Sequence, residues 1–172
     1  MTITQGGQLL GNIFVAFMGI PANRIFLKNE KIDAPKDGSI YLLIDYDGME
    51  GMVGIVSKRD YSLNTETMSM SAHERFSVEL CGFGQEATDR KNEIPMALRS
   101  SIAIRAAEDA NCSIYVAGPV LDLSSIEGSS ALRRYRIPVI MSNIERKEVA
   151  ADMIDKFPGL AGSTEESIIT EA

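Results

Sequence analysis

The residues best suited to chemistry form a glycine-rich turn at positions 82–87. Gly82, Gly84 and Ala87 fit the pattern G-x-G-x-x-A, between a stretch of strand periodicity and a stretch of helical periodicity. Such turns bring the backbone close to the pyrophosphate of a dinucleotide. The preceding strand, however, alternates polar and apolar residues, and position 107, where an acidic partner for the ribose is expected, is alanine. The sequence therefore favours a tight strand-to-helix link and leaves a small nucleotide-binding enzyme as the alternative.

The other reactive side chains do not form a recognisable constellation. His73 is the single histidine and has no evident catalytic partner, and Cys81 and Cys112 lack the spacing of metal ligands. The acidic residues between Asp45 and Glu50 do not match a calcium-binding loop, which favours a solvated loop. We therefore predict that the protein is not an enzyme and has no cofactor and no metal site.

One basic cluster occurs in the chain, at residues 133–136. Strand periodicity places Arg134 and Arg136 on one face and Arg133 beside Tyr135 on the other. The chain carries a formal net charge of -7, whereas general phosphate binding needs many clustered cations. A solvated or subunit-bridging role is therefore favoured over DNA binding for Arg134 and Arg136.

The glycine turn joins the two most regular stretches of the chain. Apolar residues alternate with polar ones over 76–80, as in a half-buried strand. Apolar residues then recur at three- and four-residue spacing over 87–107, which predicts one long helix. Pro95 lies inside this pattern and is expected to kink the helix or to mark its start.

Periodicity and turn residues predict the remaining elements. They are an amphipathic helix over 6–19, a short strand over 23–28, a strand over 40–44 buried on both faces, a turn-rich link over 45–54, a strand over 112–120 broken by Gly118-Pro119, a loop over 121–130, a strand over 132–141 and a second helix over 145–157. Pro138 predicts that its strand is an edge strand or contains a bulge.

A long polar hairpin is predicted between residues 55 and 72. Its strands, 55–61 and 65–72, contain few residues that could form a core on both faces. We expect it to project from the body and to pair with other chains, because exposed strand edges invite such pairing. Together with the two arginines, this gives the candidates for a subunit or tail interface: Met68, Met70, Arg59, Glu66, Arg134 and Arg136.

Taken together, the elements predict an α+β fold. It contains a mostly antiparallel sheet of four to six strands, flanked by an N-terminal helix and one long central helix, with a projecting β-hairpin. With 172 residues, 45% of them hydrophobic, the chain is expected to form one domain over residues 1–157, followed by a flexible C-terminal tail over 158–172. The apolar runs are too short to span a bilayer, and the first residues lack the basic region of a secretory signal, so we expect a cytoplasmic protein with reduced cysteines.

The order of these elements resembles the tail terminator (neck terminator) proteins of phages. The likeness covers roughly residues 8–145, and three stretches carry it: residues 74–107, with the strand, the glycine turn and the helix; residues 121–127 (LDLSSIE); and the final strand over 134–139 (RYRIPV).

The resemblance implies a structural protein of the virion tail or neck, assembled in the host cytoplasm. Such proteins form a hexameric ring that caps the tail tube and joins it to the head-proximal neck. The implied partners are further copies of the chain, the tail tube protein, a head-completion or connector protein and, as a further candidate, the sheath. DNA would pass through the ring without specific binding, and no membrane would be involved. A stopper or a tube subunit is the related alternative.

Overall fold

The computed structural model describes residues 1–27, 35, 38–60, 65–127 and 130–150. The chain divides into two compact units. Unit 1 contains residues 1–55 and 70–145, and unit 2 contains residues 56–69 and 146–172. The predicted tail over 158–172 lies outside the described residues.

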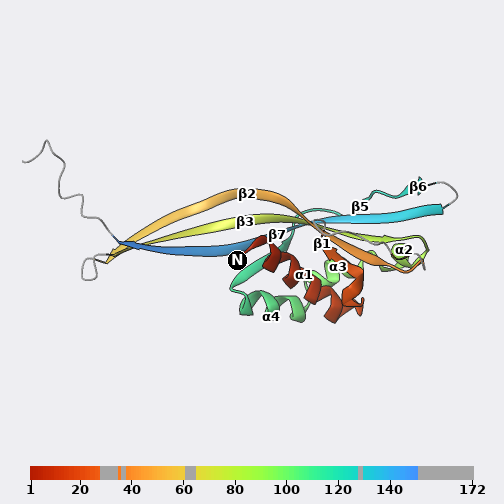
Figure 1. Cartoon of the computed structure of the whole chain (residues 1–172), viewed down its shortest axis with the longest axis horizontal. Coiled ribbons are helices and arrows are strands. Elements are labelled where there is room, and N and C mark those ends of the chain that lie inside the picture. The colour runs from red at the N-terminus through yellow and green to blue at the C-terminus, as the bar shows by residue number, and fades with distance from the viewer. Residues whose placement is uncertain (28–34, 36–37, 61–64, 128–129, 151–172) are drawn as a thin grey trace, which may run out of the picture. The chain divides into compact units, whose positions relative to one another are not determined.

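The fold is α+β, as predicted from the periodicity (Figure 1). The helical elements are α1 (Ile3–Met18), the 3-10 helix η1 (Ala22–Arg24), α2 (Glu86–Arg90), α3 (Glu93–Leu98) and α4 (Ser101–Asp109). The strands are β1 (Ile25–Leu27), β2 (Tyr41–Asp60), β3 (Thr65–Gly82), β4 (Cys112–Val116), β5 (Leu121–Asp122), β6 (Ser125–Glu127) and β7 (Ser130–Ala150).

The sheet is mixed, which corrects the expectation of a mostly antiparallel one. Its strand order is β1-β2-β3-β7-β4, and β5 and β6 also pair with β7. β4, β5 and β6 run antiparallel to β7, but β1 runs parallel to β2, with Ile25 opposite Leu42. A parallel pair needs a crossover of about a dozen residues, and the chain between Leu27 and Tyr41 is long enough to provide it.

Helix α1 is held at both ends by its own residues. The Thr2 hydroxyl accepts a hydrogen bond from the Gln5 amide, and the Gln5 side chain accepts one from the Thr2 amide, which together form a capping box. At the other end Gly19 has a φ of 67°, a conformation that glycine adopts without a steric penalty, and its amide donates to Val15. Pro21 follows, so the helix cannot continue.

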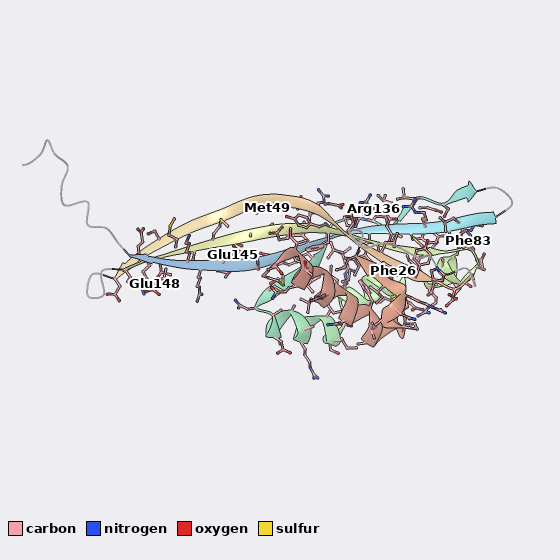
Figure 2. The ribbon with its side chains drawn as sticks, viewed as in Figure 1. Phe26, Met49, Phe83, Arg136, Glu145 and Glu148 are labelled. Atoms are coloured by element: carbon pink, nitrogen blue, oxygen red, sulfur yellow. The ribbon has the colours of Figure 1, made fainter. Side chains whose placement is uncertain are left out.

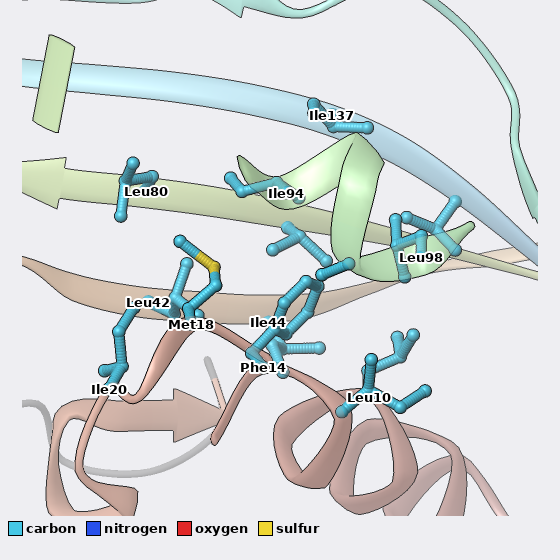
Figure 3. Packing of buried hydrophobic residues seen from close by; sticks show 14 of the residues in the cluster. Leu10, Phe14, Met18, Ile20, Leu42, Ile44, Leu80, Ile94, Leu98 and Ile137 are labelled. Atoms are coloured by element: carbon cyan, nitrogen blue, oxygen red, sulfur yellow. The ribbon is translucent and has the colours of Figure 1, made fainter. Parts of the chain in front are cut away.

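The core lies between the helices and one face of the sheet in unit 1 (Figure 3). α1 contributes Leu10, Ile13 and Phe14, all with at most 1% of their surface exposed. The strands contribute alternate residues to the core: Leu42 and Ile44 of β2, Phe76, Val78 and Leu80 of β3, and Ile137, Val139 and Met141 of β7. Successive side chains on a strand point to opposite faces, so these alternate apolar residues all lie on one face of the sheet.

The single long helix predicted over 87–107 is wrong, because three shorter helices occupy this stretch. Pro95 lies in the first turn of α3, where a residue without an N–H costs little. Ser100 begins α4 by accepting a hydrogen bond from the Ala103 amide, and its own hydroxyl donates to the Ala97 carbonyl. The apolar spacing continues across the breaks because all three helices pack on one sheet.

Two strands are longer than predicted. β2 continues through the expected turn-rich link at 45–54. Within this strand Gly48 has a φ of 120°, a backbone conformation that glycine adopts without the steric penalty of a side chain. β7 continues through residues 145–150, where a second helix was expected; residues 151–157 lie outside the described part. Likewise, short strands β5 and β6 occupy the expected loop over 121–130. In each case pairing with a neighbouring strand overrides a local preference, which is a weak constraint by comparison.

Pro138 is not on an edge strand, because β7 lies between β3 and β4. Its carbonyl accepts a hydrogen bond from the Ala117 amide at 2.9 Å, one residue beyond the end of β4. The missing N–H therefore faces the point where β4 leaves the sheet, and only one bond of the ladder is lost. Gly118 fits closely there, since a Cβ atom on it would lie 3.1 Å from Cγ of Pro138.

Candidate functional site

The face of the sheet opposite the core carries a connected set of charged and polar side chains. We call it the polar face and define it by Asp47 of β2, Ser77 and Glu79 of β3, and Arg134 and Arg136 of β7. These positions alternate with core residues along each strand, which is why they point away from the helices. All five belong to unit 1.

Glu79 is the centre of this network. It is 7% exposed and accepts a hydrogen bond from Nη2 of Arg134 at 2.6 Å. Nε of Arg136 lies 3.6 Å from its other carboxylate oxygen. A carboxylate so far removed from water needs charged or hydrogen-bonded partners, and the two guanidinium groups provide them.

Arg136 links the three strands. Its Nη2 donates to Oδ1 of Asp47 at 2.9 Å and to Oγ of Ser77 at 2.7 Å. Ser77 in turn donates to Asp47 at 3.3 Å. Each arginine of the polar face therefore faces a carboxylate of its own chain. This ties β2, β3 and β7 together and leaves little net charge for a nucleic acid.

Cys81 of β3 is buried and interacts with Glu79 and Arg134 of the polar face. Burial and the nearby Glu79 charge raise the pKa of its thiol from 9.0 to about 11. Burial also raises the pKa of Cys112, which is half-buried. Both cysteines are free, so no disulfide joins them.

This shift predicts a loss of stability at alkaline pH. In the unfolded chain the Cys81 thiol ionises near pH 9, whereas in the folded chain it stays protonated up to about pH 11. The stabilisation is therefore fully present below pH 9 and is lost as the pH rises towards 11. We expect the free energy of unfolding, measured by urea titration, to fall more steeply between pH 9 and pH 11 for the unaltered chain than for Cys81→Ala. Equal slopes would contradict the buried, protonated thiol.

The predicted interface residues fall in different surroundings. Arg134 and Arg136 meet in the polar face, with partners in their own chain. Met68 of β3 is 42% exposed and Met70 is half-buried. Glu66 accepts a hydrogen bond from the Ser57 hydroxyl, across β2 and β3. The backbone of Arg59 belongs to β2, but its side chain lies outside the described residues.

The acidic residues at 45–50 do not form the solvated loop that was expected. They belong to β2, and at least two are ion-paired: Asp47 with Arg136, and Glu50 with Arg75 at 3.8 Å. Within the described ranges, no group of three or more His, Cys, Asp or Glu side chains is arranged to hold a metal ion. Of the helices in those ranges, none has both the length and the apolar character needed to cross a membrane.

The glycine turn has a packing explanation. A Cβ atom on Gly82 would lie 3.2 Å from Cγ2 of Ile40 and 3.4 Å from Cβ of Ala87, so the absent side chain lets β3 and α2 approach. A Cβ atom on Gly84 would lie 3.9 Å from its nearest neighbour, the carbonyl oxygen of Gly38. The helix that follows, α2, has only 5 residues and offers a weak dipole to a phosphate.

The two glycines therefore make a matched pair of variants. We expect Gly82→Ala to lower the free energy of unfolding by about 1–2 kcal/mol, because Ile40 is buried and must shift. Gly84→Ala should change it by less than about 0.5 kcal/mol. Urea titration of both variants measures this difference. Stabilisation of the unaltered chain by a dinucleotide would contradict a purely structural turn.

Sequence reasoning missed two apolar residues beside the arginines. Leu121 and Leu123 are 47% and 40% exposed. Leu121 lies opposite Arg136 across the β5–β7 pair, and the Leu123 amide donates to the carbonyl of Arg134. Figure 2 shows where Arg136 lies on the sheet. The alternation Leu-Asp-Leu at 121–123 was the available signal for a strand with one apolar face.

Comparison with models of known protein families and with curated proteins found no match for this chain.

Proposed function

We propose that the chain is a non-enzymatic assembly protein of a phage tail or neck, of the terminator type. In this proposal, several copies form a ring, hexameric by resemblance, that caps the tail tube, contacts a head-completion or connector protein and lets DNA pass. The observation that carries the proposal is the length of three strands: β2, β3 and β7 contain 20, 18 and 21 residues. Strands in globular proteins usually contain about 5 or 6 residues.

The described part of unit 2 consists of the ends of these strands. It contains residues 56–60, 65–69 and 146–150, and no helix occurs among them. Ser57, Lys58 and Met68 are exposed, as are Arg146 and Lys147. A sheet that buries so little is marginal by itself in water and gains stability by pairing with another chain. The hairpin over 55–72 would accordingly be a projecting arm that joins copies.

The polar face agrees with a structural role. Its two arginines are neutralised by Glu79 and Asp47, so the surface offers no cluster of free cations to grip DNA. The net charge of -7 would repel DNA passing through a ring, which permits passage without binding. No comparable observation favours the dinucleotide-binding alternative at residues 82–87.

Two methionines of the arm test this proposal. Met68→Glu combined with Met70→Glu should prevent ring formation, because each ring contact would then bury unpaired charge. The control is Met68→Gln with Met70→Gln, which keeps side-chain length without charge and should weaken assembly much less. Sedimentation velocity and negative-stain images report the rings, and circular dichroism reports folding. Normal rings from the charged variant would refute a role for the arm.

A further inference from the structure

Phe83 is an exposed aromatic residue in the turn between β3 and α2 (Figure 2). Its side chain is 40% exposed and does not belong to the core cluster. Its neighbours on both sides are glycines, Gly82 and Gly84, so neither has a side chain that shields the ring. Aromatic residues that bind into pockets are the usual anchors of contacts between proteins. The turn thus presents a ring that is suited to anchor a partner.

The surroundings of this ring are acidic. Asp89 of α2 is exposed, and its Oδ1 accepts a hydrogen bond from Nε2 of Gln85 at 3.3 Å. This bond holds the Asp89 carboxylate beside the start of α2, close to the turn that carries Phe83. Asp89 forms no ion pair with another described residue, whereas its neighbour Glu86 is paired with Arg90. A surface complementary to this turn therefore combines an apolar hollow with a cation.

A hollow of this kind lies between α1 and α3 of unit 1, and we call it the α1–α3 groove. Its volume is about 520 Å³. Three apolar and three polar or charged residues line it: Phe17, Pro95, Met96, Asn92, Arg99 and Ser100. Met96 is 59% exposed, so its side chain is accessible from outside. Pockets of about 300–1,000 Å³ hold whole small-molecule ligands, so this groove has room for one aromatic side chain.

Arg99 supplies the cation of the groove. It is exposed at the C-terminal end of α3, and no carboxylate among the described residues pairs with it. By contrast, Arg90, Arg134 and Arg136 each face a carboxylate of the same chain. An unpaired guanidinium beside an apolar hollow favours an anionic partner, because opposite charges across a contact steer and select the partner.

We propose that Phe83 of one copy inserts into the α1–α3 groove of a neighbouring copy, where Asp89 of the first copy meets Arg99 of the second. Every copy carries both the ring and the groove, so no other kind of chain is required. The contact joins two different surfaces and therefore repeats from copy to copy until a ring closes or a filament grows. This inference rests on the proposed self-assembly and specifies one contact that produces it.

A photoreactive side chain at position 83 identifies what the turn touches. Replacing Phe83 by p-benzoylphenylalanine keeps the aromatic ring, and its benzophenone group reacts on irradiation with nearby C–H bonds, those of methionine in particular. In the full chain we expect covalent dimers on denaturing gels, with peptide mapping that places the link at Met96 or elsewhere in residues 92–100. The same replacement at Leu121, another exposed apolar residue, is the control and should not label this segment. Links within one chain, or to any other segment, would overturn the contact.

Substitutions measure the strength of the contact by sedimentation. Phe83→Ser should weaken self-association at least about tenfold, because it removes the anchoring ring. Leu121→Ser is the matched control and should leave self-association largely unchanged. Equal effects of the two serine variants would count against the contact.

The charge pair gives an independent measurement. Arg99→Glu should weaken self-association about tenfold, and adding Asp89→Arg in the same chain should restore it. Arg105→Glu changes the net charge equally at an exposed position that does not line the groove, so it controls for overall charge. Failure of the rescue, or an equal loss from Arg105→Glu, would contradict the proposed pair.

Sedimentation of the unaltered chain separates failure of the contact from failure of the proposed function. Rings that form normally in the Phe83→Ser variant would refute the contact alone. A chain that stays monomeric at the highest attainable concentration, with no cross-linked dimers, would count against both proposals.

Discussion

Replacing Phe14 by alanine should lower the free energy of unfolding by about 3–5 kcal/mol, because it removes one of the largest fully buried side chains of the core. Phe14 has 0% of its surface exposed and lies between α1 and the sheet, among Leu10, Ile44 and Leu98 (Figure 3). Removing the ring leaves a cavity that the strands cannot close, because each is held in register by its neighbours.

Phe17 provides the matched control for this substitution. It lies one turn further along α1 and is only half-buried at the margin of the core. Phe17→Ala should cost about 1 kcal/mol, since water can fill the space that it leaves. Urea unfolding with an unchanged m value measures both variants. Similar losses for the two would mean that α1 does not anchor the fold through Phe14.

Replacing Arg134 by methionine should cost about 2–3 kcal/mol, because it leaves Glu79 with its closest charged partner removed. Glu79 is 7% exposed, so water cannot replace the guanidinium fully. The remaining partner, Arg136, is more distant from the carboxylate, at 3.6 Å, and is shared with Asp47.

The double variant Arg134→Met with Glu79→Leu distinguishes the charge from the packing. Removing both partners takes away the unpaired carboxylate, so most of the lost stability should return. Chemical denaturation of the two single variants and the double variant gives the coupling energy. Additive losses would show that the two side chains contribute independently, against the network described for the polar face.

The alternating strands and the first helix were predictable because their apolar residues follow one period without interruption. Phe76, Val78 and Leu80 mark the core face of β3, and Arg134 and Arg136 were correctly expected to share a face. Which face of a strand is buried determines the residue types at these positions, so the alternation of apolar and polar residues along the strand reveals that face.

The extents of β2 and β7 were not predictable from their own residues. Asp45 to Gly54 has the composition of a turn, and 145–157 has helical spacing, yet long strands run into both stretches. Their conformation depends on partners distant in sequence. The partners of Glu79 are likewise 55 and 57 positions away along the chain, so only the folded sheet brings the network together.

The place of β7 in the sheet has a consequence for synthesis on the ribosome. β7 is the last described strand to be translated, yet it separates β3 from β4 and carries β5 and β6. Until residues 130–150 have emerged, β3 and β4 both lack the neighbour between them, and the core lacks Ile137, Val139 and Met141. Stable folding must therefore wait until nearly the whole described chain is made. Nascent chains truncated before β7 should expose unpaired strand edges and apolar core residues, which makes them targets for chaperones and proteases.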